Sequence, residues 1–446
     1  MDANITISQR TIGNILLQDV FDNLDSYLRS INSLRDAYYS NEDNLSQQLQ
    51  KKRTEFSKLN DRCTIKEENG VKTISVPNAE VYYYQKLFEN VQQAERAMEL
   101  VPPTYLVAMI SAYDAFFGGV IKSVYTIQSK SLLECDIQFT YKELSSLSSI
   151  NDVKKIIIER KIEELLRKSH IDQLRWFAKM LSLKSAISFD GLKEFVEITQ
   201  RRNLFVHSDG IVSEQYLSVC GEYEAIPEGV SIGAQLDVTN DYFDTAYQVL
   251  YRVGIMLVFT MLNVLFKKGS EEDKIEIDEK LIEYIYYMIY SEHYANAIIV
   301  SKFALEPHFK HNTFNKGFYI LNLAQSYKWK GDQAECTCIL KKMDWSGCAN
   351  ELLLPRHVLL GEFNKAYPYM VQIGKSNRTI TPAAYREWPI FKEFRKDERF
   401  KEIYAEVFGE PFNGSTPLVI EADIPIGGVT QVREDSKEQQ PTQGIL

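Results

Sequence analysis

Apolar residues recur every three or four positions along most of this chain, and this spacing places them on one side of an α-helix. The first such stretch has the seam Phe21, Leu24, Leu28, Ile31 and Leu34. The polar segment SNEDN at 40–44 then predicts a turn, followed by a return arm with Leu45, Leu49, Phe56 and Leu59. The spacing therefore predicts a helical hairpin or coiled coil over 14–60.

Length and charge narrow the class of protein. A chain of 446 residues is long enough for two or three domains, and its 45% apolar and 25% charged residues are typical of a soluble protein. The net charge of −10 argues against sequence-blind binding to long nucleic acid but leaves room for a local RNA site. Six scattered cysteines and a start without a basic-then-apolar pattern predict free thiols, no secretory signal and a cytoplasmic location.

The remaining periodicity predicts a mainly α fold. The segment 62–77 contains the alternating run NGVKTISV, which predicts a short β-hairpin. Helices are expected over 103–127, starting at Pro103, over 151–183, over 190–207 with Asp190 as N-cap and Asp209-Gly210 as the stop signal, and over 240–266. Five shorter helices then follow in pairs, over 276–290, 295–305, 316–329, 333–343 and 352–360. Residues 410–446 lose periodicity, which predicts a flexible tail.

One segment resembles a membrane span in composition. The run VLYRVGIMLVFTMLNVLF at 249–266 is strongly apolar, but Arg252 and Asn263 interrupt it. The uninterrupted part, 253–262, is much shorter than the roughly 20 residues that a span needs. We therefore expect a buried core helix and no membrane partner.

The stretch RRNLFVHSDG at 201–210 carries more polarity than a core helix needs. Asn203 and His207 are four residues apart and share a helix face, and Arg202 lies about 100° from Asn203 around the axis. A histidine in the last turn can exchange a proton, an arginine can bind a phosphate, and an asparagine can orient either. These residue types suffice to cleave RNA by attack of its own 2′-OH, without a metal or cofactor. A histidine that only caps helix carbonyls remains the alternative.

The neighbouring polar residues have weaker claims to a role. Glu197 and Arg201 are four apart in the favourable order, which predicts a surface ion pair of a few tenths of a kcal/mol. Asp114, in SAYDAFF, either supports the site or bonds a backbone group in the bundle. Cysteines 336, 338 and 348 with histidine 357 lack paired C-x-x-C spacing, so we expect no metal site.

The run RNLFVH followed by SDGIVSEQYL resembles the ribonuclease motif of the HEPN superfamily. The run LVAMISAYDAFFGGVIKSVY at 106–125 is similar to the first core helix of HEPN domains in antiviral and abortive-infection proteins, and RKSHIDQLRWFAKMLSL precedes the motif in their usual order. The resemblance implies an up-down helical bundle that dimerises to form a composite, metal-independent endoribonuclease site. On its motif the catalytic residues are Arg202, Asn203 and His207, with Arg201 as a substitute and Asp114 and Glu197 in support.

The paired helices after residue 274 resemble a degenerate tetratricopeptide-repeat array, whose groove binds proteins. We therefore expect four regions: 1–99, a helical hairpin with the β-hairpin; 100–268, the HEPN-like bundle; 274–409, the repeats; and 410–446, the tail. The expected function is RNA cleavage by a homodimer or higher oligomer in antiphage defence or as a toxin, gated by a protein partner or phage trigger at the repeats. An inactive HEPN scaffold for protein interaction is the alternative.

Overall fold

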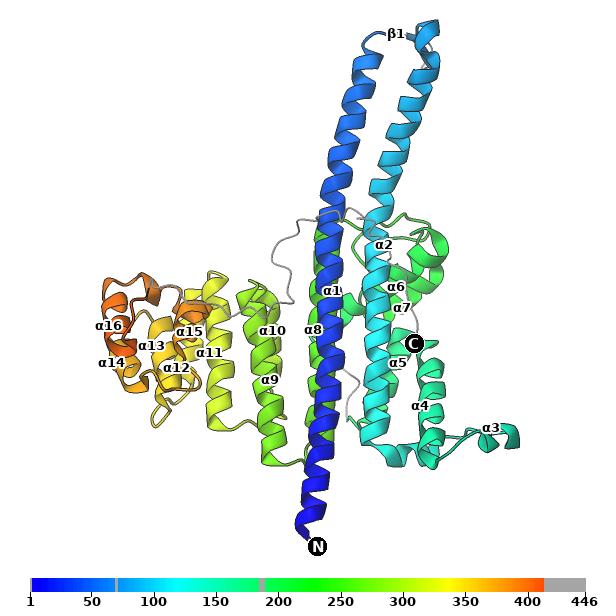
Figure 1. Ribbon diagram of the computed structural model, residues 1–446. Helices are drawn as coiled ribbons and strands as arrows, with labels where there is room; N and C mark the ends of the chain where they lie inside the picture. Colours follow the sequence, from blue (N-terminus) through cyan, green and yellow to red (C-terminus); the bar gives the residue numbers. More distant parts are fainter. Residues whose placement is uncertain (1, 69–70, 184–188, 413–446) are drawn as a thin grey trace, which may run out of the picture.

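The computed structural model describes residues 2–68, 71–183 and 189–412, and within these ranges it is almost entirely helical (Figure 1). The predicted mainly α fold is confirmed. The two strands of the described part, β1 (Thr64–Glu68) and β2 (Val71–Ser75), form an antiparallel hairpin, as the alternation in NGVKTISV predicted. The predicted flexible tail lies mostly outside the described residues.

The predicted hairpin within 14–60 is wrong. Residues Asp2–Asn60 form one continuous helix, α1, and SNEDN does not interrupt it. No glycine or proline occurs between residues 14 and 60, so the chain has no strong helix breaker there. The return arm is instead α2 (Val81–Ile127), reached through β1, β2 and the short 3₁₀ helix η1 (Asn78–Glu80). Figure 1 shows α1 and α2 side by side, with the hairpin at the far end of a long two-helix stalk.

The predicted helix start at Pro103 is also wrong, because Pro102 and Pro103 lie inside α2. Proline removes a backbone donor and usually breaks a helix. Here Val91 and Ala94 before the prolines and Leu106 and Met109 after them are all buried. Burial on both sides therefore outweighs the local cost, and the boundary expected near residue 99 falls in the middle of a helix.

The part of α1 from Leu17 to Tyr38 contributes to the bundle core. It packs with α2 and with α8 (Asn240–Leu265), and these helices share one apolar cluster. Polar side chains on α1 also reach the neighbouring backbones: the Tyr27 hydroxyl donates to the Leu250 carbonyl at 2.9 Å, and the Asn23 amide donates to the Phe116 carbonyl at 3.0 Å. The rest of the bundle is η2 (Ser129–Glu134), α3 (Tyr141–Ser145), α4 (Ile150–Leu166), α5 (His170–Met180), α6 (Leu192–Ser208) and α7 (Glu214–Glu222).

Two helical segments of the described chain, Asn78–Ile127 and α8, are long and apolar enough to cross a membrane by length and composition. Within their most apolar windows, 72% of the residues in α8 and 50% of those in the first segment are buried inside the protein. The prediction that 249–266 forms a buried core helix is therefore confirmed, and the fold is compatible with a soluble protein.

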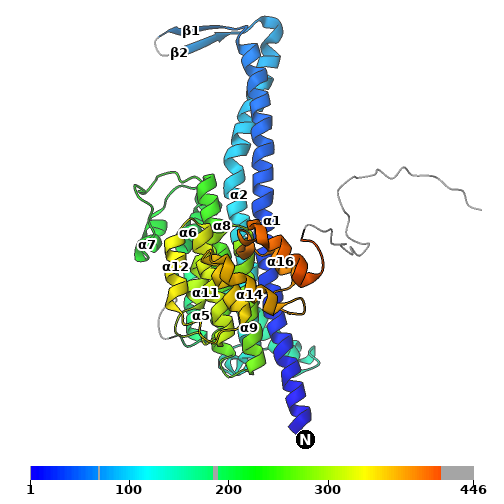
Figure 2. The same cartoon turned by 90° about the vertical axis from the view of Figure 1, so that its left-hand side faces the viewer.

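The second half of the chain forms stacked helix pairs. α9 (Glu271–Tyr290) pairs with α10 (Tyr294–Ala304), α11 (Thr313–Trp329) with α12 (Gln333–Lys342), and α13 (Asn350–Leu359) with α14 (Phe363–Ile373). A closing segment follows with α15 (Pro382–Glu387), η3 (Pro389–Phe391), η4 (Phe394–Lys396) and α16 (Glu398–Phe408). Figure 1 shows these pairs beside the bundle, and in Figure 2 they lie in front of it.

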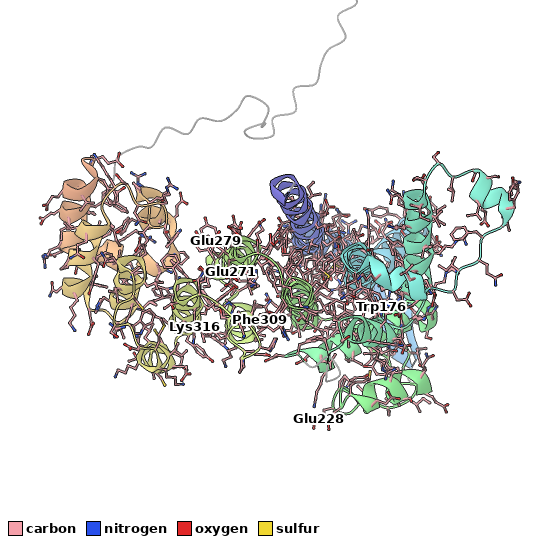
Figure 3. The ribbon with its side chains drawn as sticks, turned by 90° about the horizontal axis from the view of Figure 1, so that it is seen from below. Trp176, Glu228, Glu271, Glu279, Phe309 and Lys316 are labelled. Carbon is pink, nitrogen blue, oxygen red and sulfur yellow. The ribbon has the colours of Figure 1, made fainter. Side chains whose placement is uncertain are left out.

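The first helix pair joins the repeats to the bundle. Figure 3 shows α9, marked by Glu271 and Glu279, between the remaining repeats and α1. Buried residues of α9 and α10 belong to the same apolar cluster as α1, α2 and α8, whereas the later pairs have a core of their own. The Tyr284 hydroxyl of α9 donates to Asp25 of α1 at 2.6 Å. The first repeat pair is thus packed on the bundle through a continuous core.

His311 links the helices of the first repeats. Its Nδ1 lies 2.8 Å from the Asp278 carboxylate and its Nε2 lies 2.6 Å from the Ala304 carbonyl. Both neighbours are acceptors, so both ring nitrogens carry a proton. Burial by itself disfavours the charged ring, but the hydrogen bonds to Asp278 and Ala304 outweigh it and raise the pKa of His311.

The raised pKa predicts a pH-dependent stability. Because the folded-state pKa exceeds the unfolded value of about 6.5, the stabilisation is complete below that pH and is lost as the pH rises through the folded pKa. We expect the difference in free energy of unfolding between wild type and His311→Phe to shrink as the pH rises above about 6.5. Urea melts at several pH values measure it. A pH-independent difference for His311→Phe would contradict the charged ring.

Candidate functional site

The motif residues lie on α6, whose N-terminal end differs from the prediction. The N-cap is Gly191, with φ +99° and no side-chain cap, so Asp190 as N-cap is wrong. Arg252 of the buried helix α8 explains the glycine, since a Cβ at Gly191 would lie 2.4 Å from its Nη2. Arg252 donates from Nε to the Asp190 carbonyl at 3.3 Å. A tertiary contact therefore fixes this helix start.

The C-terminal end of α6 agrees with the prediction that Asp209 and Gly210 stop the helix. Asp209 adopts a left-handed conformation with φ +49°, and the Gly210 N–H donates to the Leu204 carbonyl at 3.2 Å. Gly210 has φ +82°, and a Cβ there would approach Gln235, Phe205 and the Leu236 carbonyl to within 2.7–2.9 Å. Only glycine fits this position without displacing the 235–236 segment. The last turn, which carries His207, is therefore held in one place.

Glu197 and Arg201 do not form the expected surface pair. Both are buried, at 6% and 7% exposure, and Arg201 Nε lies 2.7 Å from Glu197 Oε1. Tyr216 of α7 and Tyr242 of α8 each donate a hydroxyl to the Glu197 carboxylate at 2.6 Å. Arg201 also donates to the Asp237 carbonyl at 2.8 Å and lies 3.9 Å from the centre of the Tyr242 ring.

This hydrogen-bond network determines the roles of Glu197 and Arg201. Burial, followed by the adjacent carboxylate, raises the pKa values of Tyr216 and Tyr242, so both phenols stay protonated and donate to Glu197. The Arg201 guanidinium is enclosed by protein groups and does not face solvent. Arg201 and Glu197 therefore fix α6 against α7 and α8, and Arg201 is poorly placed to replace Arg202 at a substrate.

Arg202, next in sequence, has a different environment. Its side chain is 23% exposed, and its Nη1 donates to Asn203 Oδ1 at 3.1 Å. Its Nη2 lies 3.6 Å from Asp114 Oδ2 on α2. Asp114 is therefore brought beside the motif, as the supporting role required, rather than bonding a backbone group. Among the described residues, Arg202 Nε is buried without a hydrogen-bond partner.

His170 is a residue of this cluster that the sequence did not reveal. Its Nε2 lies 2.9 Å from Asp114 Oδ1, and the residue is only 6% exposed. His170 begins α5 and lies 56 positions from Asp114, so no local pattern connects the two. The run RKSHIDQLRW contains it, but only the packing of α5 on the bundle shows its partner.

His207 lies in the last turn of α6 and is exposed. It forms no hydrogen bond or ion pair with any residue in the described ranges. Val206 and Ile211, one and four positions from it in the sequence, are 46% and 47% exposed, so two apolar side chains reach the surface at this helix end. The helix thus divides its polar residues: Glu197 and Arg201 face the core, whereas Arg202 and Asn203 are partly exposed and His207 is exposed.

The cysteine-rich part of the repeats has no metal-site geometry. In the portion of the chain that the structure describes, no group of three or more His, Cys, Asp or Glu side chains is arranged to hold a metal ion. His357 is instead paired with Glu362 through its Nδ1, at 2.7 Å. Cys336 is buried and Cys338 is exposed, and both are free thiols.

No protein-family model, curated protein or solved structure matches this chain. The likeness to HEPN domains therefore remains a prediction that rests on the motif residues and their order. The geometry adds that Arg202, Asn203 and Asp114 lie together on one side of the bundle, at the end of α6 that carries His207.

The buried position of Glu197 predicts a large effect on stability. Glu197→Ala leaves Arg201 charged and without its carboxylate, and breaking a buried pair in this way costs about 3 to 5 kcal/mol. We expect a loss of this size in the free energy of unfolding from urea melts. Glu194→Ala removes an exposed carboxylate from the same helix and should change it by less than about 0.5 kcal/mol. Similar small effects for both variants would show that the network contributes little.

Proposed function

We propose that the protein is a metal-independent endoribonuclease of HEPN type, with Arg202, Asn203 and His207 as its catalytic residues. The single observation that carries this proposal is the arrangement at the end of α6. An exposed histidine in a fixed last turn lies one turn beyond an asparagine and an arginine that is oriented by a carboxylate. Packing of α6 on its neighbours accounts for Glu197 and Arg201. It does not explain the polar residues Arg202, Asn203 and His207 on the outward-facing side of the helix.

The proposed reaction needs only groups of the chain and of the RNA. His207 accepts the proton of a 2′-OH, and the oxygen attacks the adjacent phosphorus. The bond from phosphorus to the 5′-oxygen breaks, and that oxygen receives a proton. The products are a 2′,3′-cyclic phosphate and a 5′-OH end. Arg202 stabilises the charge on the non-bridging oxygens, and Asn203 orients the guanidinium through its Oδ1.

Two copies of the chain complete the proposed site. One His207 supplies one proton-transfer group, whereas the reaction benefits from a base and an acid at once. A two-fold axis beside the end of α6 would supply both. The apolar pair Val206 and Ile211, each nearly half exposed beside His207, supports pairing through this surface because such residues favour burial.

A gating role for the repeats belongs to the same proposal. Arg252, which holds the start of α6, also donates from Nη1 to Asn296 of α10 at 3.3 Å. Asn296 is buried and donates in turn to the Gln248 carbonyl at 3.0 Å. A shift of the first repeat pair would thus reach the helix that carries the motif. We propose that a protein partner or phage component acts through this junction to raise a basal cleavage rate, in a cytoplasmic antiphage or toxin setting.

The chemistry predicts cleavage that a chelator does not affect. Purified wild-type protein should cut RNA in EDTA and leave 2′,3′-cyclic phosphate ends, detectable by end-specific ligation. His207→Ala should lower the cleavage rate by about 100-fold or more, as expected for loss of a general acid–base group. Its thermal midpoint should stay within about 1 °C of wild type, because an exposed side chain contributes little to packing.

His308→Ala is the matched control, since it removes an exposed histidine from the repeats and should leave cleavage unchanged. Activity that is lost in EDTA and restored by magnesium would contradict the mechanism. An intact fold with no cleavage by the wild-type dimer would favour the inactive scaffold, with the repeats as its binding surface.

The composite site predicts that dimer formation and cleavage are lost together. Ile211→Glu places a charge on the apolar surface beside His207, where burial against a second copy would be costly. We expect sedimentation to show a monomer with cleavage reduced at least about 10-fold and the thermal midpoint unchanged. Tyr82→Glu, at a 78% exposed residue near the stalk tip, is the control. A fully active monomer would refute the composite site.

A further inference from the structure

His170 occupies an unusual position for a buried histidine. It is the first residue of α5, where Ser169 caps the helix by accepting the Asp172 N–H. Its ring packs against two fully buried aromatic side chains, with centroid distances of 5.9 Å to Tyr113 and 6.2 Å to Phe195. These two rings are themselves in contact, 5.1 Å apart. The imidazole cannot turn away from Asp114 without disturbing the core.

The hydrogen bond to Asp114 has a defined direction. A carboxylate only accepts, so His170 Nε2 carries the hydrogen and donates to Oδ1. The other carboxylate oxygen, Oδ2, is then left for Arg202 Nη2, 3.6 Å away. A continuous line of polar contacts therefore runs from the bundle core through His170 and Asp114 to Arg202, and on to Asn203.

The contact between Asp114 Oδ2 and Arg202 Nη2 is the longest in this line, and its length matters for phosphate binding. A separation of 3.6 Å is too long for a good hydrogen bond, so Asp114 orients the guanidinium by charge without occupying its donors fully. The Arg202 side chain is long and would otherwise sample several rotamers. A guanidinium that is already oriented and still has free N–H groups can bind a phosphate at low entropic cost.

We propose that His170 is a positioning residue for the ribonuclease site: it holds the Asp114 carboxylate so that Arg202 is oriented toward the scissile phosphate. The inference rests on the proposed function for its consequence in catalysis. Its structural part, that His170 restrains Arg202 through Asp114, is independent of any reaction. The two parts therefore require separate measurements.

The catalytic part is tested by single-turnover cleavage over a range of enzyme concentrations. His170→Leu should lower the rate constant at saturation by about 10- to 100-fold, as a misplacement of about 1 Å can do, with a half-saturating concentration within about 3-fold of wild type. His170→Gln places an amide N–H near the position of Nε2 and should recover most of the rate. His170→Asn keeps the polarity but is too short to reach Asp114, and it stands in for the leucine variant if that variant does not fold.

A matched control separates positioning from stability. His357 is also a buried histidine paired with a carboxylate, Glu362, but it lies in the repeats. His357→Leu should lower the thermal midpoint without changing the cleavage rate. In an Arg202→Lys background, His170→Leu should cost less than about 2-fold, since the guanidinium it restrains is already gone. Two results overturn the proposal. One is a full further loss of cleavage rate when His170→Leu is added to Arg202→Lys, and the other is a His170→Leu variant that, like His357→Leu, loses stability without losing cleavage rate.

The structural part is tested without RNA. In protein labelled with ¹⁵N-arginine, the buried Arg202 Nε–H should exchange slowly with solvent in wild type and in His170→Gln. It should exchange at least about 10-fold faster in His170→Leu, because the side chain is released. Unchanged exchange overturns the restraint whatever the activity. If the wild-type protein does not cleave RNA but His170→Leu still exchanges faster than wild type, the ribonuclease function is refuted and the restraint stands.

Discussion

Burying a carboxylate inside a helical bundle is costly unless donors satisfy its oxygens, and the position of α6 depends on how Glu197 meets this condition. Arg201 and Tyr216 donate to one oxygen and Tyr242 donates to the other. The three donors come from α6, α7 and α8, so one ionised group holds three helices together. Once α6 is fixed in this way, the rotation of the helix decides which polar residues are left for solvent.

Two adjacent arginines therefore acquire opposite roles. Successive residues on a helix are about 100° apart, so when Arg201 faces the core, Arg202 must face along the side of the bundle. There it lies beside Asp114, whose other carboxylate oxygen accepts a hydrogen bond from His170. His207 is exposed in the last turn of α6, which Asp209 and Gly210 hold in place. A site of this kind needs a rigid base, and the buried half of the motif supplies it.

The same core extends from this site to the repeats. α8 contacts α1, α2, α6 and α10, and its buried Arg252 bonds both the start of α6 and Asn296 of the first repeat pair. Burial lowers the pKa of Arg252, an effect that the charges of Asp190 and Glu194 partly offset, and its hydrogen bonds go to two neutral oxygens. A buried cation held by neutral oxygens is sensitive to small movements of its partners. This makes the junction a natural place for one region to influence the other.

The sequence by itself determined the mainly α fold, the β-hairpin at 62–77, the buried character of 249–266 and the stop of α6 at Asp209 and Gly210. All of these follow from local properties, namely periodicity, turn residues and apolar runs, which do not depend on distant neighbours. The same local reasoning placed Arg202, Asn203 and His207 on one helix end.

Tertiary structure decided everything that depends on a partner far along the chain. The seam of α1 packs with α2 and α8 in one apolar cluster instead of folding back on itself. Pro102 and Pro103 lie inside α2, where apolar residues on both sides of them are buried. Glu197 and Arg201 became a buried network only because Tyr216 and Tyr242 arrive from two other helices, and His170 reached Asp114 across 56 residues. Burial and pairing at such separations are properties of packing, which a local pattern does not encode.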